Sequence, residues 1–184
     1  MKAKRDTRSR REAGFTLIDL LFVIAVIGLL ASLAIPGLMR ARGAAQAASA
    51  LGTIRVMNSG QLSFAIGCGL GFYARTLPQL RTPAPGSDEP FLSDELTTGE
   101  VVQKSGYAFS MAGLVFANAP ASCNGIPVGG TSTSYAIVAD PIDPNIAMPR
   151  FFGTNSDGVI YEHSTTLVDD MPVAGPPPFG VPIK

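Results

Sequence analysis

Asp19 is the residue of this chain whose surroundings most demand a chemical explanation. It is a carboxylate at the start of an apolar run, because residues 20–39 contain no charged side chain. An ionisable group at membrane depth raises the free energy by a few kcal/mol and usually has a specific partner. The sequence therefore predicts a defined role for Asp19, which an ordinary anchor helix would not need.

The other side chains that could do chemistry do not form a catalytic pattern. His163 is the only imidazole of the chain and is expected on the surface at the end of a strand. A nucleophilic mechanism needs a base beside its nucleophile, and glycine-rich phosphate or dinucleotide motifs are absent from the sequence. We therefore expect no enzymatic activity and no cofactor.

Metal binding has only weak candidates. Two cysteines and one histidine are too few for a zinc cluster. Asp140 and Asp143, with Asp157, Asp169 and Asp170 further along, could offer oxygen ligands to calcium. Each of the first two precedes a proline, which favours a turn, so we expect no metal site.

Charge is distributed unevenly along the 184 residues. The 14 basic and 14 acidic side chains cancel overall, yet residues 1–14 contain six basic and two acidic ones. The rest of the chain has a net charge of −4, which argues against a protein with a broad basic surface for nucleic acid. With 46% hydrophobic and 15% charged residues, the chain is not predicted to be disordered.

The apolar run is long enough to form a membrane-spanning helix. At about 1.5 Å per residue, a helix of this length covers the roughly 30 Å hydrocarbon core. The basic arm in front of it favours a cytoplasmic amino terminus and export of the remainder. A cleaved secretory signal fits poorly, because residues 36–40 (PGLMR) offer no small-residue cleavage site. A simple anchor helix does not account for Asp19.

The residues at the start of the apolar run resemble the processing site of the type IV pilin superfamily. The match is carried by Ala13-Gly14-Phe15-Thr16-Leu17-Ile18-Asp19-Leu20-Leu21, which follow the basic leader. The superfamily includes type IV pilins and the pseudopilins of type II secretion systems. The resemblance implies that prepilin peptidase, a membrane-embedded aspartyl peptidase, cleaves between Gly14 and Phe15 and methylates the new amino group of Phe15.

Asp19 departs from the family pattern, in which the fifth mature residue is usually glutamate. The resemblance implies that this carboxylate neutralises the amino terminus of a neighbouring subunit inside the filament core, where an unpaired charge is strongly disfavoured. Aspartate keeps the charge and shortens the side chain by one methylene, so we expect pairing with an altered geometry. The efficiency of methylation and the choice between a major and a minor subunit stay open.

Gly28 and Pro36 bracket a part of the apolar helix that is intrinsically weak. Proline removes a backbone donor, and glycine weakens a helix by about 1 kcal/mol relative to alanine. In assembled members of the family, the segment between a similarly placed glycine and proline loses helical order and lets the filament stretch. A proline kink without a function is the alternative.

The chain is predicted to have an α+β fold, in which a long helix lies on a small antiparallel sheet. Residues 1–14 are the basic leader and residues 15–43 the hydrophobic helix of the membrane and filament core. Residues 44–66 continue this helix as an amphipathic part, and residues 67–184 form the exported head. A stripe of the amphipathic part is expected to face the head: Ala47, Leu51, Ile54, Leu62 and Ala65, interrupted by Asn58.

The strands of the head are predicted from β-prone segments and turn residues. They are expected at residues 106–116, 134–139, 150–153 and 159–163, the last two flanking a hairpin turn.

The remaining parts of the head are predicted to be irregular. Residues 67–90 are expected to be mainly loop, and residues 91–96 a short helical turn with Ser93 as its cap. The Thr/Ser run 131–134 is interpreted as a solvated loop. The proline-rich tail from Pro172 is predicted to be a surface strap, with a flexible end as the alternative, because its prolines exclude a helix or a central strand.

Cys68 and Cys123 are an even pair in a segment predicted to be exported, where an oxidising compartment favours a disulfide. Closing a loop of 55 residues would stabilise the fold by about 4 kcal/mol in the chain-entropy model. Two separate thiols are the alternative.

Together these features predict a structural subunit of a type IV pilus, stored in the bacterial inner membrane and then assembled into an extracellular filament. The expected partners are further copies and other pilins, prepilin peptidase, the inner-membrane assembly platform, and lipid before assembly. Nucleic acid is not an expected partner of the single subunit, and only the assembled filament could bind it. The alternatives are a pseudopilin of a type II secretion system, or a monomeric membrane-anchored periplasmic module.

Overall fold

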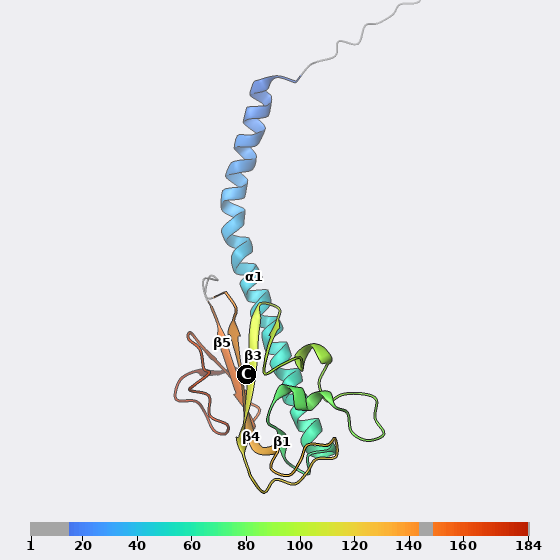
Figure 1. Cartoon of the computed structure of the whole chain (residues 1–184). Helices are drawn as coiled ribbons and strands as arrows, with labels where there is room; N and C mark the ends of the chain where they lie inside the picture. Colours follow the sequence, from blue (N-terminus) through green and yellow to red (C-terminus); the bar gives the residue numbers. More distant parts are fainter. Residues whose placement is uncertain (1–14, 144–148, 184) are drawn as a thin grey trace, which may run out of the picture. The chain divides into compact units, whose positions relative to one another are not determined.

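A computed structural model of the chain describes residues 15–143 and 149–183 (Figure 1). It contains one long helix, α1 (Leu17–Gly67), and two short 3₁₀ helices, η1 (Leu77–Arg81) and η2 (Asp94–Leu96). The strands are β1 (Tyr73–Ala74), β2 (Val101–Lys104), β3 (Tyr107–Val115), β4 (Thr131–Pro141), β5 (Phe151–Asn155), β6 (Ile160–His163) and β7 (Val181–Ile183). The chain divides into two compact units, Met1–Leu38 and Met39–Lys184.

The strands form one antiparallel sheet in the order β2-β3-β4-β5-β6-β7, and β1 pairs with the first residues of β4. Each strand from β2 onward pairs with the next one along the chain, so the sheet is a meander. The β2–β3 turn consists of Ser105 and Gly106, which have φ values of 51° and 83°. Positive φ at both central residues is the geometry that a two-residue hairpin with twisted strands requires. The α+β fold predicted from the sequence is confirmed.

All four predicted strands are present, with shifted ends. The segment 106–116 forms β3, the segment 134–139 lies within β4, and the two segments around the hairpin turn form β5 and β6. The expected helical turn at 91–96 shortens to η2; Ser93 is its N-cap residue, but its side chain makes no capping hydrogen bond.

The segment 67–90 is mainly loop, as predicted, and contains the short elements β1 and η1. The prediction for the Thr/Ser run was wrong. The run 131–134 is not a solvated loop: β4 begins there, and Thr131 and Ser132 are fully buried. The tail is a strap whose last residues pair as edge strand β7, and an edge is where a strand tolerates Pro182.

The helix face that packs on the sheet differs from the predicted stripe. The buried positions 47, 50, 54, 57, 61 and 64 alternate steps of three and four residues, which keeps them on one side of a helix. Leu62 lies off this line and is 55% exposed, so its assignment to the packed face was wrong. The packed face was not recognisable from hydrophobicity alone, because it includes the small residue Ala50 and the polar residue Gln61.

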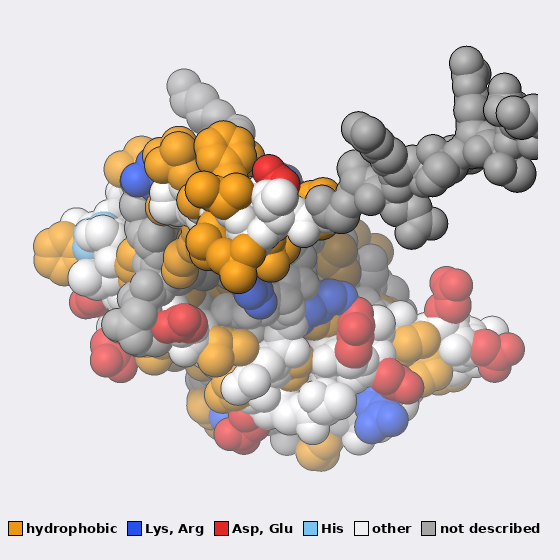
Figure 2. Space-filling view, turned by 90° about the horizontal axis from the view of Figure 1, so that it is seen from above, with side chains coloured by type: hydrophobic (Ala, Val, Ile, Leu, Met, Phe, Trp, Pro, Cys, Tyr) orange, Lys and Arg blue, Asp and Glu red, His pale blue; other side chains and the backbone are white. Residues whose placement is uncertain are grey.

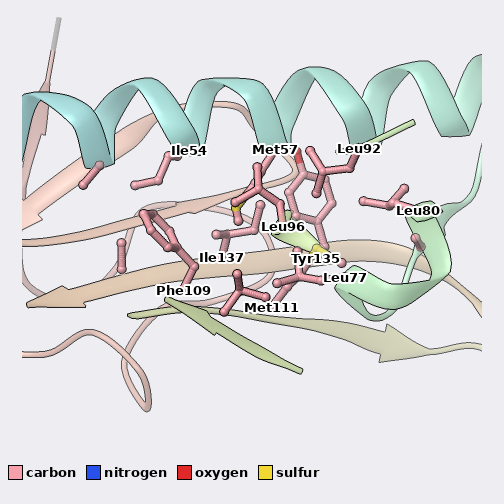
Figure 3. Close-up of a cluster of buried hydrophobic side chains, with 14 of the residues drawn as sticks. Ile54, Met57, Leu77, Leu80, Leu92, Leu96, Phe109, Met111, Tyr135 and Ile137 are labelled. Carbon is pink, nitrogen blue, oxygen red and sulfur yellow. The ribbon is translucent and has the colours of Figure 1, made fainter. Parts of the chain in front are cut away.

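The core lies between this helix face and one face of the sheet. In Figure 3, Ile54 and Met57 of α1 point toward Phe109 of β3 and Ile137 of β4, while Leu77, Leu80, Leu92 and Leu96 close one end. Alternate residues of a strand face opposite sides, so Ala136 and Val138 turn away and pack instead under Leu167 and Met171. The 164–175 segment thus covers part of the second face.

Two polar helix residues attach α1 to particular strands. Asn58 accepts a hydrogen bond from the Tyr135 hydroxyl at 3.1 Å and donates to Thr154 Oγ1 at 3.1 Å. Gln61 is fully buried; its Nε2 donates to the Ala74 carbonyl at 2.9 Å, and its Oε1 accepts from the Ala74 amide at 3.0 Å. These bonds fix the register of β1 and the sheet against the helix.

Replacing Gln61 with methionine is expected to lower the free energy of unfolding by about 2–4 kcal/mol. The substitution keeps the side-chain volume but leaves the amide and carbonyl of Ala74 buried without partners, and each unpaired buried group is worth about 1–3 kcal/mol. Gln103→Met, at an exposed position of β2, is the matched control and should change stability by less than about 0.5 kcal/mol. Thermal unfolding followed by the tyrosine circular dichroism signal would measure both variants; equal stability would show that the bonds to Ala74 contribute nothing.

Candidate functional site

The described part of the amino-terminal unit is a helix from Leu17 onward, with an apolar surface on all sides. Every residue from 15 to 38 is exposed apart from Ala31, and Leu33 is 74% exposed. In the space-filling view of Figure 2, hydrophobic side chains cover the amino-terminal end of α1. This helix is long and apolar enough to cross a membrane. So much apolar surface is stable only when lipid or protein replaces water around it.

Asp19 lies in the first turn of this helix and interacts with Thr16. Its Oδ2 accepts hydrogen bonds from the Thr16 amide at 3.2 Å and from the Thr16 hydroxyl, while the Asp19 amide donates to Thr16 Oγ1 at 3.3 Å. This reciprocal arrangement is a capping box, which satisfies amides that the helix itself cannot pair. The carboxylate is therefore held at the amino-terminal end of the helix.

The role of Thr16 as the partner of Asp19 was missed at the level of the sequence. The spacing Thr16-Leu17-Ile18-Asp19 is a Ser/Thr-x-x-acid pattern in front of an apolar run, which is enough to predict a capping box. Phe15 precedes the helix and is 80% exposed. Gly14, the other residue of the predicted cleavage site, lies outside the described residues.

Gly28 and Pro36 are both inside an unbroken helix. Apart from the adjacent residues and the backbone of the helix itself, nothing lies within 4 Å of the position that a Gly28 side chain would occupy. Pro36 has no amide hydrogen, so the carbonyl of Ser32 lacks its usual helical donor. The Ser32 side chain makes a separate bond, in which its hydroxyl donates to the Leu29 carbonyl at 2.8 Å. Loss of helical order between Gly28 and Pro36 in a filament stays a prediction.

Cys68 and Cys123 form a disulfide, with their Cα atoms 4.9 Å apart. Cys68 follows the last residue of α1, and its carbonyl also accepts the Cys123 amide at 3.0 Å. The bond joins the carboxy-terminal end of the helix to the loop before β4. It therefore attaches the carboxy-terminal end of α1 covalently to the head.

Asp140 and Asp143 are the two residues that the sequence offers as weak metal candidates. Among the described residues, no group of three or more metal-ligating side chains comes together. Asp140 lies near the end of β4, where its Oδ2 accepts from the Thr166 hydroxyl at 2.5 Å and its Oδ1 is buried without a hydrogen-bond partner. Burial raises the pKa of Asp140, and the Thr166 bond opposes this in part. Asp143 is exposed.

Because its pKa is raised, ionised Asp140 destabilises the folded chain. The folded state binds this proton more tightly than the unfolded state, so the free energy of unfolding should fall as pH rises above the unfolded pKa of 3.8 toward the higher folded pKa. Asp140→Asn removes this dependence. We expect the difference in melting temperature, variant minus wild type, to increase from pH 3.5 to pH 7. Asp88→Asn, at an exposed site, is the control, and a difference independent of pH would contradict the expectation.

His163 is at the end of β6, as expected, with Nδ1 2.8 Å from the Thr165 hydroxyl.

Comparison of the chain with protein-family models, with curated proteins and with solved structures finds no match. The architecture itself, a long apolar amino-terminal helix, an antiparallel sheet packed on its second part and a disulfide, is compatible with that of a pilin.

Proposed function

We propose that the chain is a structural subunit of a type IV pilus, which is cleaved between Gly14 and Phe15 and polymerises through its amino-terminal helix. The observation that carries the proposal is a single carboxylate, Asp19, held at the start of a helical segment, residues 17–38, that is otherwise uncharged and is exposed except at Ala31. A helix that only anchors the head could be capped by an uncharged side chain, whereas insertion into lipid disfavours a carboxylate.

The apolar helix supplies the attraction between subunits. Before assembly, lipid surrounds residues 15–38; in the filament, equivalent helices of other copies replace the lipid. Side chains such as Phe22 (71% exposed) and Leu33 are covered in both environments, so the transfer does not require apolar surface to enter water. Close packing between helices then favours the filament over the bilayer.

Asp19 supplies the register between subunits. Cleavage would create a positively charged amino group on Phe15, next to the Thr16 amide that already bonds to Asp19. In the low-dielectric core of a filament, each ammonium needs a carboxylate within reach. The carboxylate of a neighbouring copy can meet this need at one axial offset only, because the helix contains no other charge between residues 15 and 39.

The head, in this proposal, faces the outside of the filament and determines what the pilus contacts. Its disulfide suits an oxidising environment. A pseudopilin of a type II secretion system would share every feature above, and a monomeric anchored module would share all but the use of Asp19.

Intact-mass spectrometry of material sheared from cells that produce the full chain with a pilus assembly machinery tests the proposal. We expect a mass that starts at Phe15, is one methyl heavier, and is two hydrogens lighter for the Cys68–Cys123 bond. Processed protein found only in the membrane fraction would indicate a pseudopilin or a minor subunit rather than a major pilus subunit. A chain that still carries residues 1–14 would overturn the proposal and leave a membrane-anchored module.

A further inference from the structure

A cavity of about 410 Å³ lies on the face of the sheet that turns away from α1. Ala112 of β3 and Ala136 and Val138 of β4 line it, together with Met171 and Val173 of the segment that covers this face. The lining is mainly apolar, and the volume is in the range of sites for small organic ligands. The cavity lies wholly within the Met39–Lys184 unit, so binding there does not require the chain to form a filament.

Two oppositely charged side chains also line this cavity. Arg75 directly follows β1, and Glu100 directly precedes β2. β2 pairs with β3 only as far as Val101 and Ser110, and both of these residues also line the cavity. Arg75, after the end of β1, and Glu100, before the start of β2, are 25 residues apart in the sequence. The fold therefore brings a guanidinium and a carboxylate to one site.

Neither charge has a counter-charge in the described part of the chain. The other described cations of the head do: Arg81 pairs with Asp94, Lys104 with Glu95, and Arg150 with Glu162. Arg75 and Glu100 line the same cavity and do not pair with each other, and the Arg75 Nε is buried without a hydrogen-bond partner. A partly desolvated guanidinium without a partner is unfavourable, so the site favours an anion.

We propose that this cavity binds apolar α-amino acids or short apolar peptides with free ends. Their shared chemistry is a carboxylate, an ammonium and an apolar side chain in one small molecule. The Arg75 guanidinium would bind the carboxylate, since it presents paired donors that match a carboxylate. Glu100 would bind the ammonium, and the side chain would lie on Ala112, Ala136 and Val138.

The two charges contribute unequally. Arg75 is half-buried, so its bond to a carboxylate is poorly screened by water, whereas Glu100 is exposed and its attraction to an ammonium is screened. Removal of the ligand's carboxylate is therefore expected to weaken binding more than removal of its ammonium. An uncharged apolar compound of the same size is expected to bind least.

The test uses the full chain in phospholipid nanodiscs and ligand-observed saturation-transfer NMR, with empty nanodiscs as the blank. The probes are L-leucine and Leu-Leu, which distinguish free amino acids from peptides. Leucinamide lacks the carboxylate, and N-acetyl-leucine lacks the ammonium. We expect saturable binding of leucine or Leu-Leu, at least about tenfold weaker binding of leucinamide, and a smaller loss with N-acetyl-leucine.

Variants connect the binding to the cavity. Arg75→Gln is expected to weaken binding at least about tenfold and Glu100→Gln severalfold. Ala112→Phe places a large side chain at an exposed position of the lining and is expected to abolish binding without entering the core. Arg81→Gln, which removes an exposed arginine that does not line the cavity, is the matched control and should bind as the wild type does.

The proposal is overturned if neither leucine nor Leu-Leu saturates the wild-type chain, or if Ala112→Phe binds as well as the wild type. Leucinamide bound as tightly as leucine would also overturn it, because Arg75 would then have no role. Thermal unfolding of each variant separates loss of a site from loss of the fold; a folded Ala112→Phe variant that no longer binds supports the site.

Discussion

Asp19→Ala is expected to reduce the yield of sheared filaments at least about tenfold, while cleavage before Phe15 continues. The variant removes the only carboxylate of the apolar helix, so the ammonium of Phe15 would enter the filament core without a counter-charge. Breaking a buried pair by removing one partner costs about 3–5 kcal/mol, and every subunit that joins would bear this penalty. Quantifying the sheared fraction against total processed protein, by mass spectrometry and immunoblot, measures the effect.

Two further variants separate the charge of Asp19 from its capping role. Asp19→Glu keeps the carboxylate and should retain most filament yield. Thr16→Val removes the hydroxyl that bonds to Asp19 while leaving the charge; loss of a cap costs about 1 kcal/mol, and filaments should still form. Normal yield from Asp19→Ala, or a larger defect in Thr16→Val, would refute the pairing role and leave Asp19 as a capping residue.

The sequence was most informative about α1 and about the hairpin β5–β6. Uninterrupted apolar residues predict a membrane-length helix on their own, since few other structures tolerate them. The Asn155–Gly158 turn has a local cause as well: the Asn155 side chain accepts the Asp157 amide at 3.1 Å, and Gly158 has a φ of 75°. Features that depend on a few adjacent residues can be recognised without knowledge of the rest of the fold.

Other features depend on contacts between distant residues and were not predictable. β1 has two residues and is held by buried Gln61, 13 positions earlier in the chain, rather than by its own propensity. β4 begins with a polar run whose hydroxyls look solvent-facing, yet Ser132 is paired with β1 and β3 and donates to the Tyr73 carbonyl at 3.3 Å. Tertiary pairing overrides local polarity at such positions.

The same reasoning applies to the candidate sites. Asp19 was identified because it is the single charge in an apolar run. Its capping interaction with Thr16 could have been predicted from the local Ser/Thr-x-x-acid pattern. Arg75 and Glu100 have no pattern of their own, since an isolated arginine or glutamate in the head is usually a solvated surface residue. Only the meeting of the ends of β1 and β2 at one cavity distinguishes this pair.

Loss of the Cys68–Cys123 bond is expected to lower the free energy of unfolding of the head by about 4 kcal/mol, through the entropy of the unfolded chain. The bonded loop contains β1, β2 and β3, so its release frees a large part of the sheet in the unfolded state. The Cys68→Ser/Cys123→Ser double variant should retain the native fold, because the packing of Phe64 and the hydrogen bond from the backbone amide of residue 123 to the carbonyl of residue 68 remain in place.

Thermal unfolding of the full chain, followed by tyrosine circular dichroism with and without a reducing agent, measures this effect. The melting temperature of the wild type should fall on reduction to the value of the double variant, and that of the double variant should not respond. Loss of the disulfide is also expected to lower the amount of intact protein recovered in the sheared extracellular fraction. If the oxidised and reduced chains unfold at the same temperature, the hydrogen bonds and packing at the end of α1 already fix the 117–130 loop, and the disulfide adds no stability.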